Sequence, residues 1–166
     1  MRVFINREPK EGPWGGGNKT LSGVCEFLKR EGHDVFFDLV DNLDILFCFD
    51  PRPNDKGVWY QTLWDYKQRH GAKIIQRVGD LGTHSKPELF ELVKQTLPHS
   101  DAVIFPSLWA KKYSGHTGGN YQVIPNRPSS VFYRHTRDVP SNNEELPRVV
   151  THHWSNNLLK GFDFYK

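Results

Sequence analysis

The sequence predicts an α/β protein built on a doubly wound parallel sheet. Three observations lead to this fold class. Short apolar segments alternate with amphipathic segments of helix length, polar loops rich in glycine or proline follow the apolar segments, and the 166 residues are 37% hydrophobic and 25% charged, as in ordinary globular domains. Alternation at this spacing favours about six parallel strands with right-handed crossovers and helices on both faces.

The expected elements follow one another along the first 125 residues. The expected strands are 3–5, 34–38, 44–49, 73–77, 101–106 and 121–125, and the expected helices are 18–31, 58–70, 85–97 and 107–113. Gly32 ends the first helix. The third strand is nearly all apolar, as expected of a strand covered on both faces. It cannot continue further, because Pro51 and Pro53 lack the N–H that a strand ladder requires.

The composition changes after residue 136. Residues 137–147 are polar and carry a proline near each end, which is typical of a linker or an exposed loop. Beyond it, residues 148–151 predict one more strand and residues 158–166 the start of one more helix. The expected organisation is therefore an N-terminal domain (1–136), a linker (137–147) and the start of a second domain (148–166).

Charge and cysteine content exclude several classes of function. The net charge of +3 comes from 22 basic and 19 acidic residues spread along the chain, so we expect no nucleic-acid partner, although an anionic ligand is tolerated. Cys25 and Cys48 fall on an expected helix face and in an expected buried strand, and neither a zinc pattern nor a disulfide framework follows. No metal site is expected. The chain enters a strand directly after Met1, so we expect a cytoplasmic protein.

The segment 12–19, with the sequence GPWGGGNK, lies between the first strand and the first helix. Consecutive glycines let the backbone approach a ligand closely, and the following helix end adds partial positive charge, so this order predicts a site for a phosphate or a sugar hydroxyl. Trp14 supplies an aromatic platform and Lys19 a cation. The alternative is a flexible surface loop.

Polar residues also follow the fourth expected strand. Arg77 suits pairing with an anionic substrate group, and Asp80 suits holding a sugar hydroxyl, because ligands of parallel sheets bind beyond the carboxyl ends of the strands. A local salt bridge or a loop cap is the alternative for both. His84 is a candidate contact to substrate or an ordinary loop residue.

Three segments together resemble one enzyme family. The segment 12–19, the Ile-Pro-Asn of residues 124–126 and the stretch 151–166 are similar to glycosyltransferases of the GT-B class, group 1 (family 4). The resemblance implies two Rossmann-like domains facing each other, of which the first takes the acceptor and the second the sugar nucleotide. The chain corresponds to the first domain of that family plus the start of the second. Because most of the domain that takes the sugar nucleotide is not included, the 166 residues alone are expected to be inactive.

The resemblance implies transfer of a sugar, with retention, from a nucleotide-sugar to a glycan or lipid-linked acceptor, without a cofactor, and it leaves room for peripheral membrane contact. The residues that it and the strand ends assign are Arg77 and Asp80 for catalysis, Gly15, Gly16, Gly17, Asn18, Lys19 and Lys160 for the donor phosphates, and Trp14, His84 and Asn126 for sugar or acceptor.

The chain departs from the family pattern at two places that are relevant to the site. Arg127-Pro128-Ser129 stands where many members have Gly-Val-Asp, and residues 77–80 stand where members often carry a histidine. Two other functions stay open. One is a dinucleotide-binding protein with Gly15, Gly17 and Asp38 as its fingerprint, although Thr20 stands at the third glycine position. The other is a non-catalytic sugar-binding domain.

Overall fold

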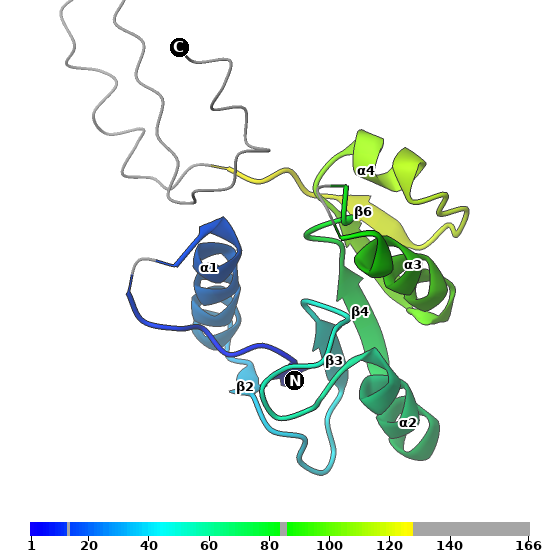
Figure 1. The fold of residues 1–166 in the computed structure, drawn as a ribbon. Helices are drawn as coiled ribbons and strands as arrows, with labels where there is room; N and C mark the ends of the chain where they lie inside the picture. Colours follow the sequence, from blue (N-terminus) through cyan, green and yellow to red (C-terminus); the bar gives the residue numbers. More distant parts are fainter. Residues whose placement is uncertain (13, 84–85, 128–166) are drawn as a thin grey trace, which may run out of the picture. The chain divides into compact units, whose positions relative to one another are not determined.

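The computed structural model describes residues 1–12, 14–83 and 86–127 (Figure 1). The elements of this part are β1 (Arg2–Ile5), α1 (Gly16–Arg30), β2 (Asp34–Phe36), β3 (Ile45–Cys48), α2 (Tyr60–His70), β4 (Lys73–Arg77), α3 (Pro87–Thr96) with a 3-10 turn (Leu97–His99), β5 (Ala102–Phe105), α4 (Leu108–Tyr113) and β6 (Tyr121–Val123). The six strands form one parallel sheet in the order β2-β1-β3-β4-β5-β6. This confirms the predicted α/β class with a parallel sheet.

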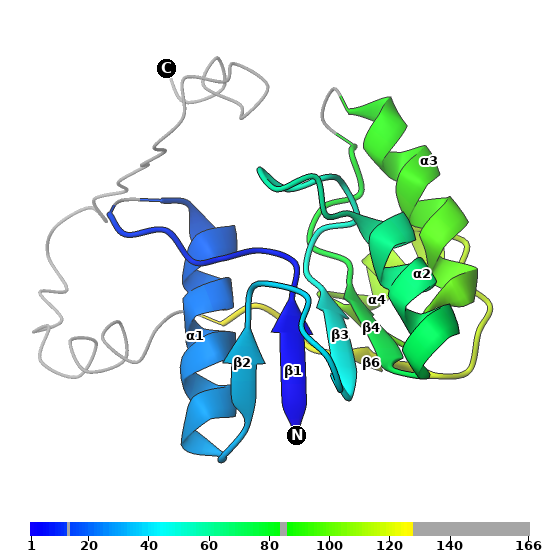
Figure 2. The same ribbon diagram turned by 90° about the horizontal axis from the view of Figure 1, so that it is seen from below.

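The helices cover both faces of the sheet, with α1 on one face and α2 to α4 on the other (Figure 2). Alternate residues of each strand point to opposite faces of the sheet, so β1 contributes side chains to the apolar layers on both faces. Its Val3 and Ile5 pack against Leu21 of α1, whereas Phe4 packs against Leu63 of α2. The winding direction therefore reverses between β1 and β3, and such a switch point is where open α/β sheets bind ligands.

A loop replaces a helix in the connection from β2 to β3. Leu39, Val40 and Leu43 of this loop pack into the same apolar cluster as Phe4. The Tyr66 hydroxyl donates to the Val40 carbonyl at 2.8 Å and accepts from the Leu43 N–H at 3.2 Å. The loop thus covers β1 and is fastened to α2.

Most element boundaries differ from the predictions by one or two residues, and two of these differences concern the candidate site. Helix α1 begins at Gly16 rather than at Asn18, because the Asn18 and Lys19 N–H groups already bond to the Gly15 carbonyl and close the first turn. The expected loop of three glycines is therefore wrong in extent, since Gly16 and Gly17 are helical. Strand β2 ends at Phe36, so Asp38 lies outside the strand, where it pairs with Lys56.

The chain divides into two compact units, Met1–Pro125 and Asn126–Lys166. The predicted linker (137–147) and the predicted elements within 148–166 lie outside the described residues. In the described part, no helix has both the length and the apolar character needed to span a bilayer.

Candidate functional site

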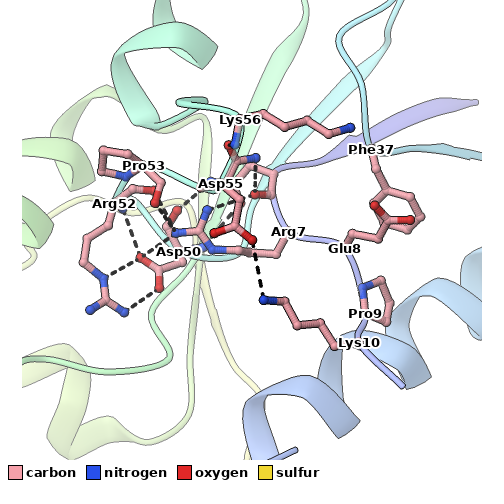
Figure 3. Close-up of a pocket in the computed structure, with 12 residues that line it drawn as sticks. Arg7, Glu8, Pro9, Lys10, Phe37, Asp50, Arg52, Pro53, Asp55 and Lys56 are labelled. Carbon is pink, nitrogen blue, oxygen red and sulfur yellow. Dashed lines mark hydrogen bonds and ion pairs between the residues drawn. The ribbon is translucent and has the colours of Figure 1, made fainter. Parts of the chain in front are cut away.

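A cavity of about 390 Å³ opens at the carboxyl ends of β1 and β3, at the switch point of the sheet (Figure 3). Its walls come from the β1–α1 loop, the β3–α2 loop and the residue after β2. The lining residues are Asn6, Arg7, Glu8, Pro9, Lys10, Phe37, Asp50, Arg52, Pro53, Asn54, Asp55 and Lys56. Four cations and three carboxylates thus face one space, which suits a ligand rich in hydroxyl groups or a ligand with an anionic group.

Asn6 fixes the floor of this cavity. Its side chain is fully buried and joins the ends of the two strands, since Oδ1 accepts from the Phe49 N–H at 2.8 Å and Nδ2 donates to the Asp50 carbonyl at 2.5 Å. Asn54 in turn donates to the Asn6 carbonyl at 3.2 Å. A buried amide with both ends satisfied holds neighbouring loops in one arrangement.

Two arginines and a carboxylate form the wall. Arg52 contacts both oxygens of Asp50, and Arg7 donates to the carbonyls of Arg52 at 2.8 Å and Pro53 at 3.2 Å. Burial raises the pKa of the Asp50 carboxyl, but the hydrogen bonds from Arg52 outweigh this effect and hold the pKa below its ordinary value. Asp50 is therefore an anion at neutral pH, and its charge is compensated.

The rim carries looser ion pairs. Lys10 lies 3.5 Å from Asp55, and Lys56 pairs with Asp38. All four side chains are more than half exposed, so these pairs contribute little to stability and their charges remain available to a ligand.

The amino end of α1 is joined to this rim through Asn18. The Asn18 side chain accepts from the Lys10 N–H at 2.8 Å and donates to the Lys10 carbonyl at 2.7 Å. Among the described residues no side chain caps α1, and its first turn holds no acidic residue. The first-turn N–H groups of Gly16 and Gly17 therefore present partial positive charge that no side-chain cap and no acidic residue of the first turn offsets.

Trp14 takes part in the same loop. Its Nε1 donates to the Glu11 carbonyl at 2.8 Å, and Lys10 lies 5.2 Å from the ring centroid. The indole remains 52% exposed, and Lys19 is exposed as well. The Glu11 carbonyl thus takes the indole N–H and Lys10 lies over the ring, while about half of the Trp14 surface stays open to solvent.

Arg77 and Asp80 occupy the carboxyl end of β4. The Arg77 guanidinium lies over the Phe49 ring at 4.8 Å and fills the space where a Cβ on Gly79 would stand, at 2.4 Å from Nη1. Burial lowers the pKa of Arg77. The side chain keeps its charge, since a guanidinium is not deprotonated in proteins.

Asp80 accepts from the Gly82 N–H at 2.8 Å and pairs with Lys86 at 3.1 Å. Burial raises the pKa of Asp80, but these bonds and the nearby charge of Arg52 lower it by more, so the carboxyl titrates below its ordinary range.

The predicted residues fall into three groups. Arg77 and Asp80 lie at the carboxyl ends of the strands, and so do Trp14, Asn18, Lys19 and the three glycines. Asn126 is the first residue of the second unit, and the site is built from the first unit alone. His84 and Lys160 lie outside the described residues.

Sequence reasoning missed Arg7, Asp50 and Arg52. The signal was present, because these residues follow β1 and β3 as Arg77 and Asp80 follow β4. The two prolines of the segment Pro51-Arg52-Pro53 predict a loop at the carboxyl end of the strand, and in the structure the carbonyl groups of Arg52 and Pro53 also orient Arg7.

Comparison of the chain with family models, with curated proteins and with solved structures finds no significant match. In the described ranges, no three His, Cys, Asp or Glu side chains group in a way that could hold a metal ion.

Proposed function

We propose that this protein is a glycosyltransferase of the GT-B kind, which moves a sugar from a nucleotide-sugar to a glycan or lipid-linked acceptor, and that its first unit is the acceptor-side domain. One observation carries the proposal. The uncapped, glycine-built amino end of α1 lies at the ligand-binding edge of a parallel sheet and is fastened through Asn18 to a cavity with cationic and anionic side chains.

The chemistry of such a transfer requires compensation of the charge that develops on the departing diphosphate. The N–H groups of Gly16 and Gly17 and the ammonium of Lys19 supply positive charge at the start of α1. We assign Lys160 the same role from the family resemblance. The assigned catalytic residues are Arg77, which pairs with an anionic group, and Asp80, which accepts a hydrogen bond from a sugar hydroxyl.

The dinucleotide-binding alternative receives less support. Its fingerprint requires a tight turn after the first strand, whereas residues 6–15 separate β1 from α1. It also requires an acidic residue at the end of the second strand to hold a ribose. Asp38 lies two residues beyond β2, is 72% exposed and pairs with Lys56.

A donor assay tests the proposal. Because the resemblance implies that transfer needs a complete second domain, a protein that carries both domains is incubated with UDP-, GDP- and ADP-sugars and a panel of acceptor glycosides, and release of nucleoside diphosphate is measured with and without a chelator. We expect release with at least one donor, at the same rate in the chelator. Release with none of the donors, together with calorimetric binding of NAD, would favour the dinucleotide alternative.

A matched pair of glycine variants tests whether the activity depends on the amino end of α1. A Cβ added at Gly16 or at Gly23 meets no atom within 4 Å, so the two positions are matched in the space around the first side-chain atom. Only Gly16 lies in the first turn, where a side chain would stand between the N–H groups and the donor. We expect Gly16→Val to abolish release and Gly23→Val to preserve it. Equal rates in the two variants would contradict the assignment.

A further inference from the structure

A second, smaller cavity lies between the β4–α3 loop and the start of α4. Its volume is about 200 Å³, and Gly79, Asp80, Thr83, Ser107 and Trp109 are among its lining residues. Cavities that take drug-sized ligands measure about 300–1,000 Å³. This one therefore has room for a single ring rather than for a nucleotide.

Trp109 forms the aromatic side of this cavity. Its ring is stacked on Tyr113, with centroids 4.9 Å apart and an angle of 20° between the planes, and Tyr113 contacts Phe90 at 5.1 Å. Trp109 is nevertheless 58% exposed. An indole that is held in one orientation while remaining open to solvent presents a preformed apolar surface at low entropic cost.

Asp80 forms the polar side. The Gly82 N–H and the Lys86 ammonium occupy one position on each carboxylate oxygen, and the side chain is 45% exposed. A carboxylate has about four acceptor positions. The remaining positions can accept hydrogen bonds from hydroxyl groups of a ligand in the cavity.

We propose that this cavity binds one pyranose ring of the acceptor, with a C–H face of the ring against Trp109 and a ring hydroxyl donating to Asp80. A pyranose combines an apolar face with hydroxyl groups at its rim, which matches an aromatic surface beside a hydrogen-bond acceptor. The identity of the ligand as an acceptor sugar rests on the proposed function, whereas the binding of a sugar ring does not.

A membrane surface is the competing partner for α4. Leu108 is 60% exposed, and Lys111 and Lys112 add positive charge. Two features favour the sugar. Trp109 borders a cavity instead of projecting from a flat face, and the carboxylate of Asp80 in that cavity would repel anionic headgroups.

Saturation-transfer NMR of the protein without donor tests the inference, with methyl α- and β-glycosides of glucose, galactose and mannose as probes. We expect transfer to ring C–H protons of at least one glycoside. Trp109→Ala should weaken that binding about two- to twelvefold, which corresponds to the loss of one aromatic contact. Trp109→Tyr should retain most of it. The matched control Leu108→Ala removes an equally exposed apolar side chain that does not line the cavity, and it should leave binding unchanged.

Two outcomes would overturn the inference. One is saturation transfer that is the same in wild type and in Trp109→Ala. The other is absence of transfer together with co-sedimentation with phosphatidylglycerol vesicles that both Leu108→Ala and Trp109→Ala abolish, which would make α4 a membrane contact. Glycoside binding that depends on Trp109 in a protein that releases no nucleoside diphosphate would refute the proposed function and leave the sugar site in place.

Discussion

Arg52 holds both oxygens of Asp50 with one edge of its guanidinium, with Nε 3.0 Å from Oδ1 and Nη2 2.7 Å from Oδ2. The Arg52 backbone N–H also donates to Oδ1 at 3.0 Å. This closed arrangement fixes the loop after β3, and the loop carbonyls in turn orient Arg7. The geometry of the larger cavity thus depends on one bidentate pair.

We expect Arg52→Lys to loosen this loop, because an ammonium cannot form two parallel hydrogen bonds with a carboxylate. The pair is partly exposed, so the expected loss of unfolding free energy is about 0.5–1.5 kcal/mol, measured by urea denaturation. The control is Arg69→Lys, which changes an exposed arginine that donates to a backbone carbonyl within α2. A loss as large in the control would show that the bidentate geometry is unimportant.

Gly82→Ala should destabilise the protein more than Gly71→Ala. Both glycines have positive φ, of +69° and +75°, so alanine strains the backbone at either position by about 1–2 kcal/mol. At Gly71 the new Cβ meets no atom within 4 Å, whereas at Gly82 it would stand 2.1 Å from the Lys86 carbonyl oxygen. The loop that carries Asp80 must then move as well.

Denaturant unfolding of both glycine variants measures the difference. We expect the additional clash at Gly82 to cost about 1–3 kcal/mol beyond the loss at Gly71. Equal losses would mean that the β4–α3 loop adapts freely, in which case Asp80 is not held by the hydrogen bond from the Gly82 N–H.

Asp101 makes the stability of the protein dependent on acid pH. Its carboxylate accepts from the Lys67 ammonium at 2.6 Å and from the Ile74 N–H at 2.8 Å. Burial raises the pKa of Asp101, but these bonds lower it by more. A carboxyl with a depressed pKa contributes stability above its unfolded pKa of about 3.9, and this contribution is lost as the pH falls through the folded pKa.

Asp101→Asn should therefore lower the unfolding free energy at pH 7 by about 1–2 kcal/mol and by less at pH 3, where the wild-type carboxyl is being protonated. Thermal unfolding at the two pH values measures this. Asp65→Asn is the control, because the Asp65 carboxylate accepts from Gln61 on the exposed surface of α2. An Asp101→Asn effect that is equal at both pH values would contradict the prediction.

Asn18→Ala should release the loop before α1, because it removes both hydrogen bonds to the Lys10 backbone. We expect faster tryptic cleavage after Lys10 and slower release of nucleoside diphosphate in the donor assay. Thr20→Ala serves as the control, since the Thr20 hydroxyl bonds to the Gly16 carbonyl within the helix. Unchanged cleavage in Asn18→Ala would show that the loop is held by other contacts.

The local sequence pattern predicted the exact first and last residues of some elements. Strand β4 begins at Lys73 and ends at Arg77 as expected, since buried and exposed residues alternate along it and glycines lie on either side. The order of the strands in the sheet could not be obtained in this way. The position of β1 between β2 and β3 depends on which segments far apart in the sequence share an apolar layer.

The site was predictable only in part for the same reason. The rule that ligands bind beyond strand ends drew attention to Arg77 and Asp80 at the carboxyl end of β4. The rule does not say at which strands a ligand binds until the position of the switch point in the sheet is known. Arg7 and Arg52 follow the two strands at that point, and their role as cavity walls depends on contacts between loops 45 residues apart.

The central position of β1 has a consequence for synthesis of the chain. Of the six strands of this sheet β1 is synthesised first, yet it has a partner on each side, and the second partner ends at Cys48. At a synthesis rate of about 5–20 residues per second, about 2–9 s pass between the synthesis of β1 and the synthesis of β3. During this interval Val3 and Ile5 have α1, Val35 and Phe37 as apolar neighbours but lack Phe47 of β3. Nascent chains that stop before residue 48 should therefore associate with chaperones or aggregate.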